Sequence, residues 1–199
     1  MQVNRLVNSF YTSNTYIISD TVGDGVWLVD CGDYISQVKP LLEGRKVLGV
    51  LLTHTHSDHI YGLVDLLEDF PLAKVFTNDF GIVALGDSRL NLSHYHSEVP
   101  DLSIKNLKNV VSVDEGMEIP LFDDLSASVL STPGHDKSCL SYLIGGHLFT
   151  GDSYIPGERL VAIFPNSDRT LAKESYNRLL KLSYNHIVCP GHGAIVFNE

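Results

Sequence analysis

Cysteine is scarce in this sequence, and the three present, Cys31, Cys139 and Cys189, are widely separated with no Cys-x-x-Cys spacing. An odd number of isolated cysteines argues against a disulfide framework and against a zinc site built from thiolates. We therefore expect a reducing, cytoplasmic environment. The cysteines lie at or near predicted strand ends, and we expect small core residues there and not nucleophiles.

Long apolar runs and basic charge are lacking too. No run approaches membrane-spanning length, and the first residues lack the charged and then apolar segments of a signal peptide. We therefore expect a soluble protein that is not exported and has no membrane partner. The 14 basic residues against 24 acidic ones give a formal net charge of -10. Such a surplus repels polyanions, so nucleic acid is not expected as a partner.

The length and pattern of the chain fit one globular domain. Over 199 residues, 44% are hydrophobic, which predicts a single domain, residues 1–199, with a sizeable core. Short β-branched or aromatic runs predict strands at residues 15–18, 26–29, 47–52, 74–77, 126–130, 140–144, 147–150 and 187–189. Helical spacing of apolar residues predicts helices at residues 38–42 (weakly), 60–67, 79–85 and 171–182.

The order of these elements predicts the architecture. The first two strands should pair as an antiparallel hairpin around the turn at residues 22–25, and residues 86–107 are expected to be loop-like. Asp168 or Thr170 can serve as the N-cap of the last helix. Two halves that each mix strands and helices predict two packed sheets with helices outside.

One stretch has too much polarity for an ordinary turn. Residues 53–59 carry three imidazoles and one carboxylate within six positions, at His54, His56, Asp58 and His59. The stretch follows a predicted buried strand and precedes a predicted helix, so it lies where open α/β folds bind ligands. It therefore predicts a metal centre, with His59 in the first turn of the helix.

Three later segments have the same form, a short β-rich run followed by a glycine and a potential ligand. They end at His135, Asp152 and His192. Glycine beside a ligand lets the backbone approach closely without a Cβ clash. Imidazoles and carboxylates without thiolates favour zinc, iron or manganese. Five histidines and two aspartates exceed the needs of one tetrahedral ion, so we infer two ions.

With these residues in place, the chain resembles the metallo-β-lactamase-fold hydrolases, and among them the glyoxalase II-like (hydroxyacylglutathione hydrolase-like) branch. The His-x-His-x-Asp-His signature and the three later ligands occur in the family's order. Asp30, in a Val-Asp-Cys-Gly context, is similar to the family's first motif, and residues 91–93 are similar to a segment common in the branch. The resemblance implies an α/β (α+β) fold, a four-layer αββα sandwich of two mixed β-sheets with outer helices.

The resemblance also implies roles for the site residues. One ion would be held by His54, His56 and His135, the other by Asp58, His59 and His192, with Asp152 bridging them. Asp30 would steady the ligand loop without binding an ion. The ions would be zinc, with iron or manganese as alternatives.

The function that follows is a dinuclear metal-dependent hydrolase of a small molecule. A metal-bridged hydroxide would attack the carbonyl of a thioester or activated ester, and Asp58 could help to pass a proton to the leaving group. The alternatives are a mononuclear-iron persulfide dioxygenase, or a lactonase or phosphodiesterase of the same fold. Sequence alone leaves these alternatives open.

The sequence departs from the branch in two places. It stops at Glu199, before the C-terminal helical extension with which glyoxalase II binds glutathione, so glutathione specificity is not expected to carry over. Residues 157–167 lack the Gly-Arg pattern that many small family members show after the bridging aspartate, so substrate contacts in that segment cannot be transferred.

Other polar residues near these motifs have plainer interpretations. We expect His94 and His96 to lie in a solvated loop, although one of them could line the pocket. His147 and His186 are expected at the surface. Tyr154 could direct its hydroxyl at a substrate or pack in the core.

Overall fold

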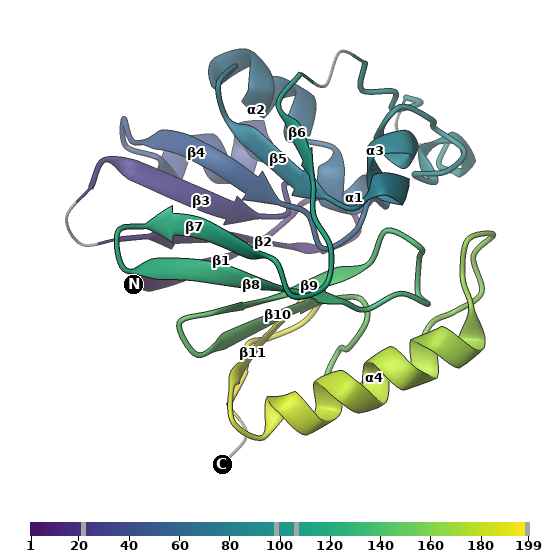
Figure 1. Cartoon of the computed structure of the whole chain (residues 1–199). Coiled ribbons are helices and arrows are strands. Elements are labelled where there is room, and N and C mark those ends of the chain that lie inside the picture. Colours follow the sequence, from purple (N-terminus) through teal and green to yellow (C-terminus); the bar gives the residue numbers. More distant parts are fainter. Residues whose placement is uncertain (21–22, 98–99, 106–107, 198–199) are drawn as a thin grey trace.

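Two six-stranded sheets pack face to face in the computed structural model, which describes residues 1–20, 23–97, 100–105 and 108–197 (Figure 1). The strands of the first sheet, in spatial order, are β1 (Gln2–Val7), β2 (Asn14–Ser19), β3 (Gly25–Val29), β4 (Lys46–Leu51), β5 (Lys74–Thr77) and β6 (Val110–Ser112). Pairing is antiparallel from β1 to β3 and parallel from β3 to β6. This sheet is therefore mixed, as the sequence predicts.

The second sheet is also mixed. In spatial order its strands are β12 (Val196–Phe197), β11 (Ile187–Pro190), β10 (His147–Gly151), β9 (Leu140–Ile144), β8 (Leu125–Ser131) and β7 (Glu118–Phe122). Only the pair β10 and β11 is parallel. Because β10 and β11 run in the same direction, the loops that follow them emerge at the same edge of the sheet.

Helices cover the outer faces of both sheets (Figure 1). Against the first sheet lie α1 (Ser57–Ile60), α2 (Leu63–Asp69) and α3 (Asp79–Leu85), and against the second lies α4 (Arg169–Ser183). A π-helical turn η1 (Tyr34–Val38) and two 3₁₀ turns, η2 (Lys39–Leu41) and η3 (Ser93–Tyr95), complete the helical segments. This is the predicted αββα sandwich, and the prediction of the fold is confirmed.

The core has three layers, and strand β2 shows how the sequence builds them. Tyr16 and Ile18 belong to the cluster between the two sheets, whereas Ile17 belongs to the cluster beneath α1 and α2. Successive side chains of a strand point to opposite faces, so a strand covered on both sides is apolar at nearly every position. A third cluster joins β10 and β11 to α4 through Leu148, Val188 and Leu179.

Most predicted elements are present, including the antiparallel hairpin of β2 and β3, in which Ile17 pairs with Leu28. The hairpin's turn was predicted at residues 22–25, and residue 22 lies outside the described ranges. The loop-like interpretation of residues 86–107 holds in the described part, where η3 is the single helical turn. The N-cap of α4 is Asp168, whose carboxylate accepts hydrogen bonds from the backbone of Thr170 and Leu171.

Two helix predictions differ from the structure. The helix expected at residues 60–67 is divided into α1 and α2. Cys31 N donates to His59 O (2.8 Å) and Gly62 N donates to Cys31 O (2.9 Å), and these two hydrogen bonds to Cys31 interrupt the hydrogen bonds of the helix. The weak helix at residues 38–42 is instead η1 followed by η2, with Pro40 within η2.

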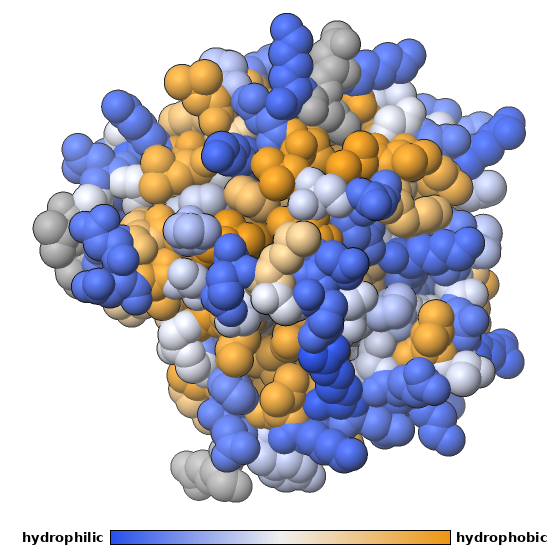
Figure 2. All heavy atoms as spheres, viewed as in Figure 1, coloured by the Kyte–Doolittle hydropathy of each residue, from blue (hydrophilic) through white to orange (hydrophobic). Residues whose placement is uncertain are grey.

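The surface carries most of the charge. Hydrophilic side chains project around the margin of the face shown in Figure 2, while apolar atoms gather toward its middle. Within the described ranges, Asp30 and Asp136 are the only buried carboxylates. The three cysteines are buried, as predicted, and burial raises the pKa of each thiol. Across those same ranges no helix combines the length and the apolar character needed to cross a membrane.

Candidate metal centre

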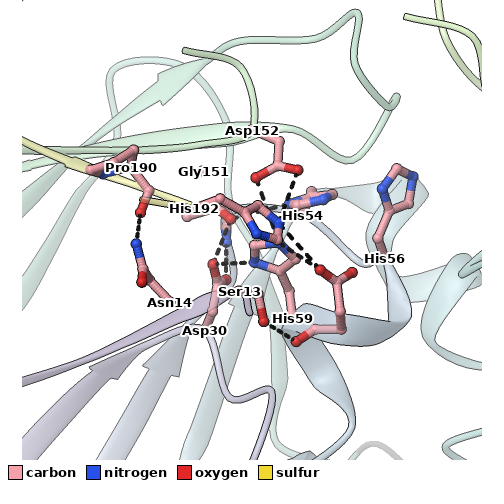
Figure 3. Close-up of polar contacts among 12 residues, drawn as sticks. Ser13, Asn14, Asp30, His54, His56, His59, Gly151, Asp152, Pro190 and His192 are labelled. Carbon is pink, nitrogen blue, oxygen red and sulfur yellow. Dashed lines mark hydrogen bonds and ion pairs between the residues drawn. The ribbon is translucent and has the colours of Figure 1, made fainter. Parts of the chain in front are cut away.

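The structure brings all seven predicted ligands together at one edge of the sandwich. Figure 3 labels five of them, His54, His56, His59, Asp152 and His192. The first sheet supplies four of them from the loop after β4 and the start of α1: His54, His56, Asp58 and His59. The second sheet supplies His135 from the loop after β8, Asp152 from the end of β10 and His192 from the loop after β11. Each ligand therefore follows a strand or begins a helix, as the sequence predicts.

The ligand atoms form three overlapping groups, and within each group they lie within 4.8 Å of one another. The groups are His54, His56 and His135; Asp58, His59 and His192; and His54, His59 and Asp152. Two of these are the ligand sets that the family resemblance implies. The third includes Asp152, which lies between the other two.

Asp152 contacts ligands of both sets. Its Oδ2 lies 3.6 Å from His135 Nε2 and 3.5 Å from His192 Nε2, and its Oδ1 lies 3.6 Å from His59 Nε2. Asp58 Oδ2 lies 3.3 Å from His192 Nε2. The assignment of these residues to individual ions stays a prediction.

The chemistry of the cluster fits cations. His54 Nε2, His59 Nε2 and Asp152 Oδ1 are buried, and none of them has a hydrogen-bond partner among the described residues. An unsatisfied buried polar atom costs free energy, and such atoms normally have a partner. Neutral imidazoles and carboxylates that converge without partners are suited to divalent metal ions.

The charges of the cluster are coupled. Burial lowers the pKa of His54 and of His135, which keeps both imidazoles neutral and able to bind a metal. Burial alone would lower the pKa of His59, but the nearby carboxylates of Asp58 and Asp30 raise it to about 10. For Asp58, burial opposes ionisation, and the neighbouring His59 and His192 more than offset it, so the pKa lies below its usual range.

Two glycines permit this crowding. A Cβ atom at Gly191 would lie 2.1 Å from Asp152 Oδ1. Gly151 has a φ of +49°, and a Cβ there would lie 2.5 Å from Thr53 Oγ1. No other residue type allows the backbone to come this close, as predicted for glycines beside the ligands.

Asp30 holds the ligand loop. Its carboxylate accepts hydrogen bonds from Thr53 N (2.7 Å) and Thr53 Oγ1 (2.7 Å), and it lies 2.9 Å from His59 Nδ1. Burial raises the pKa of Asp30, and the contact with His59 opposes that shift. Asp30 therefore directs His59 Nε2 toward the ligand cluster, which is the geometry its predicted role requires.

Several supporting residues escaped the sequence analysis. Asn14 Nδ2 and Tyr16 Oη donate to Pro190 O (2.8 and 2.7 Å) and hold the loop that carries His192. Val161 O lies 2.9 Å from His135 Nδ1, so it accepts the proton on that nitrogen and leaves Nε2 for the cluster. The polar run at the start of the buried strand β2 was the one sequence signal for Asn14. Val161 could not be predicted from the sequence, because it acts through its backbone carbonyl.

A cavity of about 320 Å³ opens over the cluster. Apart from the ligands, its lining is mostly apolar or aromatic: Tyr11, Leu92, Tyr154, Ile155, Leu160, Val161, Phe164 and Tyr176, with His96, Ser153, Glu158 and Arg159. Much of this wall comes from residues 154–164, which overlap residues 157–167, the segment where the sequence departs from the glyoxalase II-like branch. The wall sets the size and polarity of what can reach the cluster.

The remaining predictions for polar residues have mixed outcomes. His96 lines the cavity and lies 2.8 Å from Tyr11 Oη, whereas His94 lies 3.0 Å from Asp101 in the solvated loop. Tyr154 packs edge-on against Tyr176 in the core and also lines the cavity, and a contact of its hydroxyl with a substrate stays a prediction. His147 and His186 are half-buried and lie outside the ligand groups.

The sequence model of the Metallo-beta-lactamase superfamily matches residues 9–192, and the chain belongs to that superfamily. Among curated proteins, it is similar to the hydroxyacylglutathione hydrolase of Xanthomonas axonopodis pv. citri (strain 306), at 28% identity over 197 residues that cover 94% of this chain. The chain spans 64% of that relative's length.

Solved structures show the same fold. The BLEG-1 B3 metallo-beta-lactamase superposes with a TM-score of 0.86 at 24% identity, covering 98% of this chain and 93% of that one. TTHA1623, solved in a di-iron-bound form, superposes with a TM-score of 0.80 at 26% identity, covering 98% and 95% of the two chains.

Proposed function

We propose that this protein is a dinuclear metal-dependent hydrolase that cleaves a thioester or activated ester of a small molecule. The observation that carries this proposal is the complete cluster of seven ligands, with unpartnered buried donor atoms, at the base of an open cavity. The similarity to a hydroxyacylglutathione hydrolase supports the substrate class.

The residues would divide between two ions as the family resemblance implies. One ion would be held by His54, His56 and His135, the other by Asp58, His59 and His192, and Asp152 would be shared. Two bound divalent ions supply a water of lowered pKa and a Lewis acid for a carbonyl oxygen. The ions would be zinc, with iron or manganese as alternatives.

The properties of Asp58 favour substrates with a good leaving group. Asp58 lines the cavity, as Asp152 and Glu158 also do, and it is the carboxylate that we propose exchanges a proton there. Its pKa is held below the usual range, so it is rarely protonated near neutral pH and is a weak proton donor. A thiolate or an activated alkoxide leaves with little protonation, whereas an amine or an ordinary alkoxide needs it.

The cavity wall supports a small, largely apolar acyl group. Phe164 packs edge-on against His56 and His135, with ring centroids 5.0 and 5.5 Å apart, so an apolar surface reaches the ligands themselves. Among the lining residues that the structure describes, Arg159 is the one basic residue apart from the histidines, and it is exposed to solvent. A carboxylate or phosphate on the outer part of the substrate would find its charge partner there.

The test combines metal content with a substrate panel. Protein loaded with zinc, iron or manganese would be assayed on acyl thioesters of rising chain length, a lactone, a phosphodiester and glutathione persulfide. We expect two ions per chain and fastest turnover of thioesters with short apolar acyl groups. One iron per chain with oxygen uptake on the persulfide would replace this proposal with the dioxygenase, and turnover of the phosphodiester alone would replace it with a phosphodiesterase.

A further inference from the structure

Asp136 is a buried carboxylate that no other part of the proposed function uses. It follows the ligand His135 directly and is fully buried. Its Oδ1 accepts hydrogen bonds from Ser138 N (2.8 Å) and Ser138 Oγ (2.5 Å). Its Oδ2 has no hydrogen-bond partner in the described part of the chain and lies 3.6 Å from His56 Nε2, which also has none. Each of these two unpartnered atoms therefore faces the other.

The ring of His56 has a defined orientation between two neighbours. On one side its Nδ1 lies 3.1 Å from His135 Nε2, within the predicted ligand set of the first ion. On the other side its Nε2 faces Asp136. A neutral imidazole carries its proton on one nitrogen and a lone pair on the other, and the partner of one nitrogen decides which form is present. A carboxylate at Nε2 favours the proton there and leaves the lone pair on Nδ1.

We propose that Asp136 is the positioning residue of the first ion's site: its Oδ2 holds the proton on His56 Nε2, so that Nδ1 presents its lone pair to the ion. This rests on the proposed function, in which His56 is a metal ligand. Asp30 has the matching relation to His59, a predicted ligand of the second ion. The two buried carboxylates of the described chain thus serve one ion each, and carboxylate–histidine–metal arrangements of this kind tune metal affinity.

The same carboxylate also supports the ligand loop, and this second role can be separated from the first. Ser138 Oγ accepts hydrogen bonds from Thr55 N (3.0 Å) and Thr55 Oγ1 (3.1 Å). Asp136 Oδ1, through Ser138, therefore fixes residue 55 between the two ligands His54 and His56. Oδ1 acts on the loop and Oδ2 acts on the ring.

The substitution Asp136→Asn separates the two roles. Asparagine has nearly the same side-chain volume as aspartate and can keep its carbonyl oxygen toward Ser138. Its amide N–H then faces His56 Nε2 and favours the form of the ring with the lone pair on Nε2 and the proton on Nδ1. Ser138→Ala is the matched control, because it removes the loop contact and leaves Asp136 Oδ2 beside His56. Zinc affinity is measured by chelator competition, and the protonated nitrogen of His56 by ¹⁵N NMR of the metal-free protein.

We expect Asp136→Asn to weaken the binding of one of the two zinc ions by about 10–100-fold and to move the proton of His56 from Nε2 toward Nδ1. Ser138→Ala should leave that proton on Nε2. Zinc affinity and ring form both unchanged in Asp136→Asn would overturn the proposal, since a role in loop packing alone predicts that result. If the Asp136→Asn protein does not fold, the ¹⁵N NMR spectrum of the metal-free wild-type protein provides the test, because a proton on Nδ1 of His56 in that spectrum contradicts the proposal.

The NMR measurement also keeps the two proposals apart. A wild-type protein that binds no zinc, iron or manganese would contradict the proposed function while leaving the ring form of His56 measurable. A wild-type protein that binds two ions, with His56 protonated on Nδ1, would support the function and contradict the role of Asp136.

Discussion

At the scale of single residues, the proton on His59 links metal binding to pH. In the metal-free protein the pKa of His59 is raised to about 10, as burial is outweighed by the carboxylates of Asp58 and Asp30. A raised pKa means that the protonated form stabilises the fold fully below about pH 6.5 and loses that contribution as the pH rises through about 10. At pH 8 the imidazole is thus protonated, and it must lose its proton to bind an ion.

We therefore predict that zinc binding to the metal-free protein at pH 8 releases a proton from His59. Titration calorimetry in two buffers of different ionisation enthalpy measures this release as a difference in heat. The release should fall as the pH is raised past about 10. Equal heats in both buffers at pH 8 would contradict the prediction.

Asp152 is the residue whose loss should affect both ions, because it contacts His59, His135 and His192. We predict that Asp152→Ala lowers bound metal below two ions per chain and lowers kcat/KM by at least about 100-fold, the scale on which one electrostatic contact to a transition state acts. Metal analysis and thioester hydrolysis check this together. Asp114→Ala, at an exposed position outside the site, is the control, and full metal occupancy in Asp152→Ala would remove the shared role.

The residues that gather in the cluster could be predicted from the sequence, whereas the residues that orient them could not. His54 is visible because imidazoles and a carboxylate crowd residues 53–59, and His192 is visible because it repeats the pattern of a strand end, a glycine and a potential ligand. Asp136 was missed because its role depends on a ring from a segment 80 residues earlier in the chain, at His56. Contacts between side chains of distant segments leave no local pattern.

At the scale of elements, the start of α4 is fixed by Asp168. Its carboxylate accepts hydrogen bonds from Thr170 N (2.8 Å) and Leu171 N (3.0 Å), two backbone donors that would otherwise lack a partner at the helix terminus. We predict that Asp168→Ala lowers the free energy of unfolding by about 0.5–2 kcal/mol, measured by urea denaturation. Thr170 is the alternative N-cap, and Thr170→Ala should change the free energy of unfolding by less than about 0.5 kcal/mol. A larger loss of that free energy in Thr170→Ala than in Asp168→Ala would contradict the assignment of Asp168 as the N-cap.

The strands that sequence analysis missed share a physical reason. Each of the four missed strands, β1, β6, β7 and β12, lies at an edge of its sheet. An edge strand pairs with one neighbouring strand, whereas β2 and β4 each pair with two. Edge strands tolerate polar residues and proline, as at Pro120 in β7. The apolar runs that predicted the central strands are therefore weak or interrupted at the edges.

At the scale of the whole molecule, the ligands are divided between the two sheets, so ion binding should stabilise the sandwich. A ligand that binds the folded state alone adds about 2.7 kcal/mol when its free concentration is 100 times its dissociation constant. For a chain of this size that raises the Tm by about 5–10 °C per site. We predict this rise when zinc is added to metal-free protein, measured by calorimetry, and an unchanged Tm would contradict a site shared by both sheets.

The order of strands within each sheet was beyond sequence analysis, and so was their number, because β1, β6, β7 and β12 were not predicted. The chain that connects β10 to its neighbour β11 includes the whole of α4 and the segment before it. Pairing between strands so far apart in the sequence depends on packing between parts of the chain that share no local signal. The order of the elements predicted two packed sheets with helices outside, and the family resemblance added that both sheets are mixed.

The hydrogen bonds from Asn14 and Tyr16 to Pro190 have a consequence for the time course of synthesis. These two residues leave the ribosome long before their partner, which follows α4 in the chain. A nascent chain that extends through α4 already contains six of the seven ligands, but it lacks β11, the loop that carries His192 and the partner that orders the start of β2. The complete set of predicted ligands therefore exists only after the segment that follows α4 has been translated, and full loading of the proposed metal site would follow the synthesis of that segment.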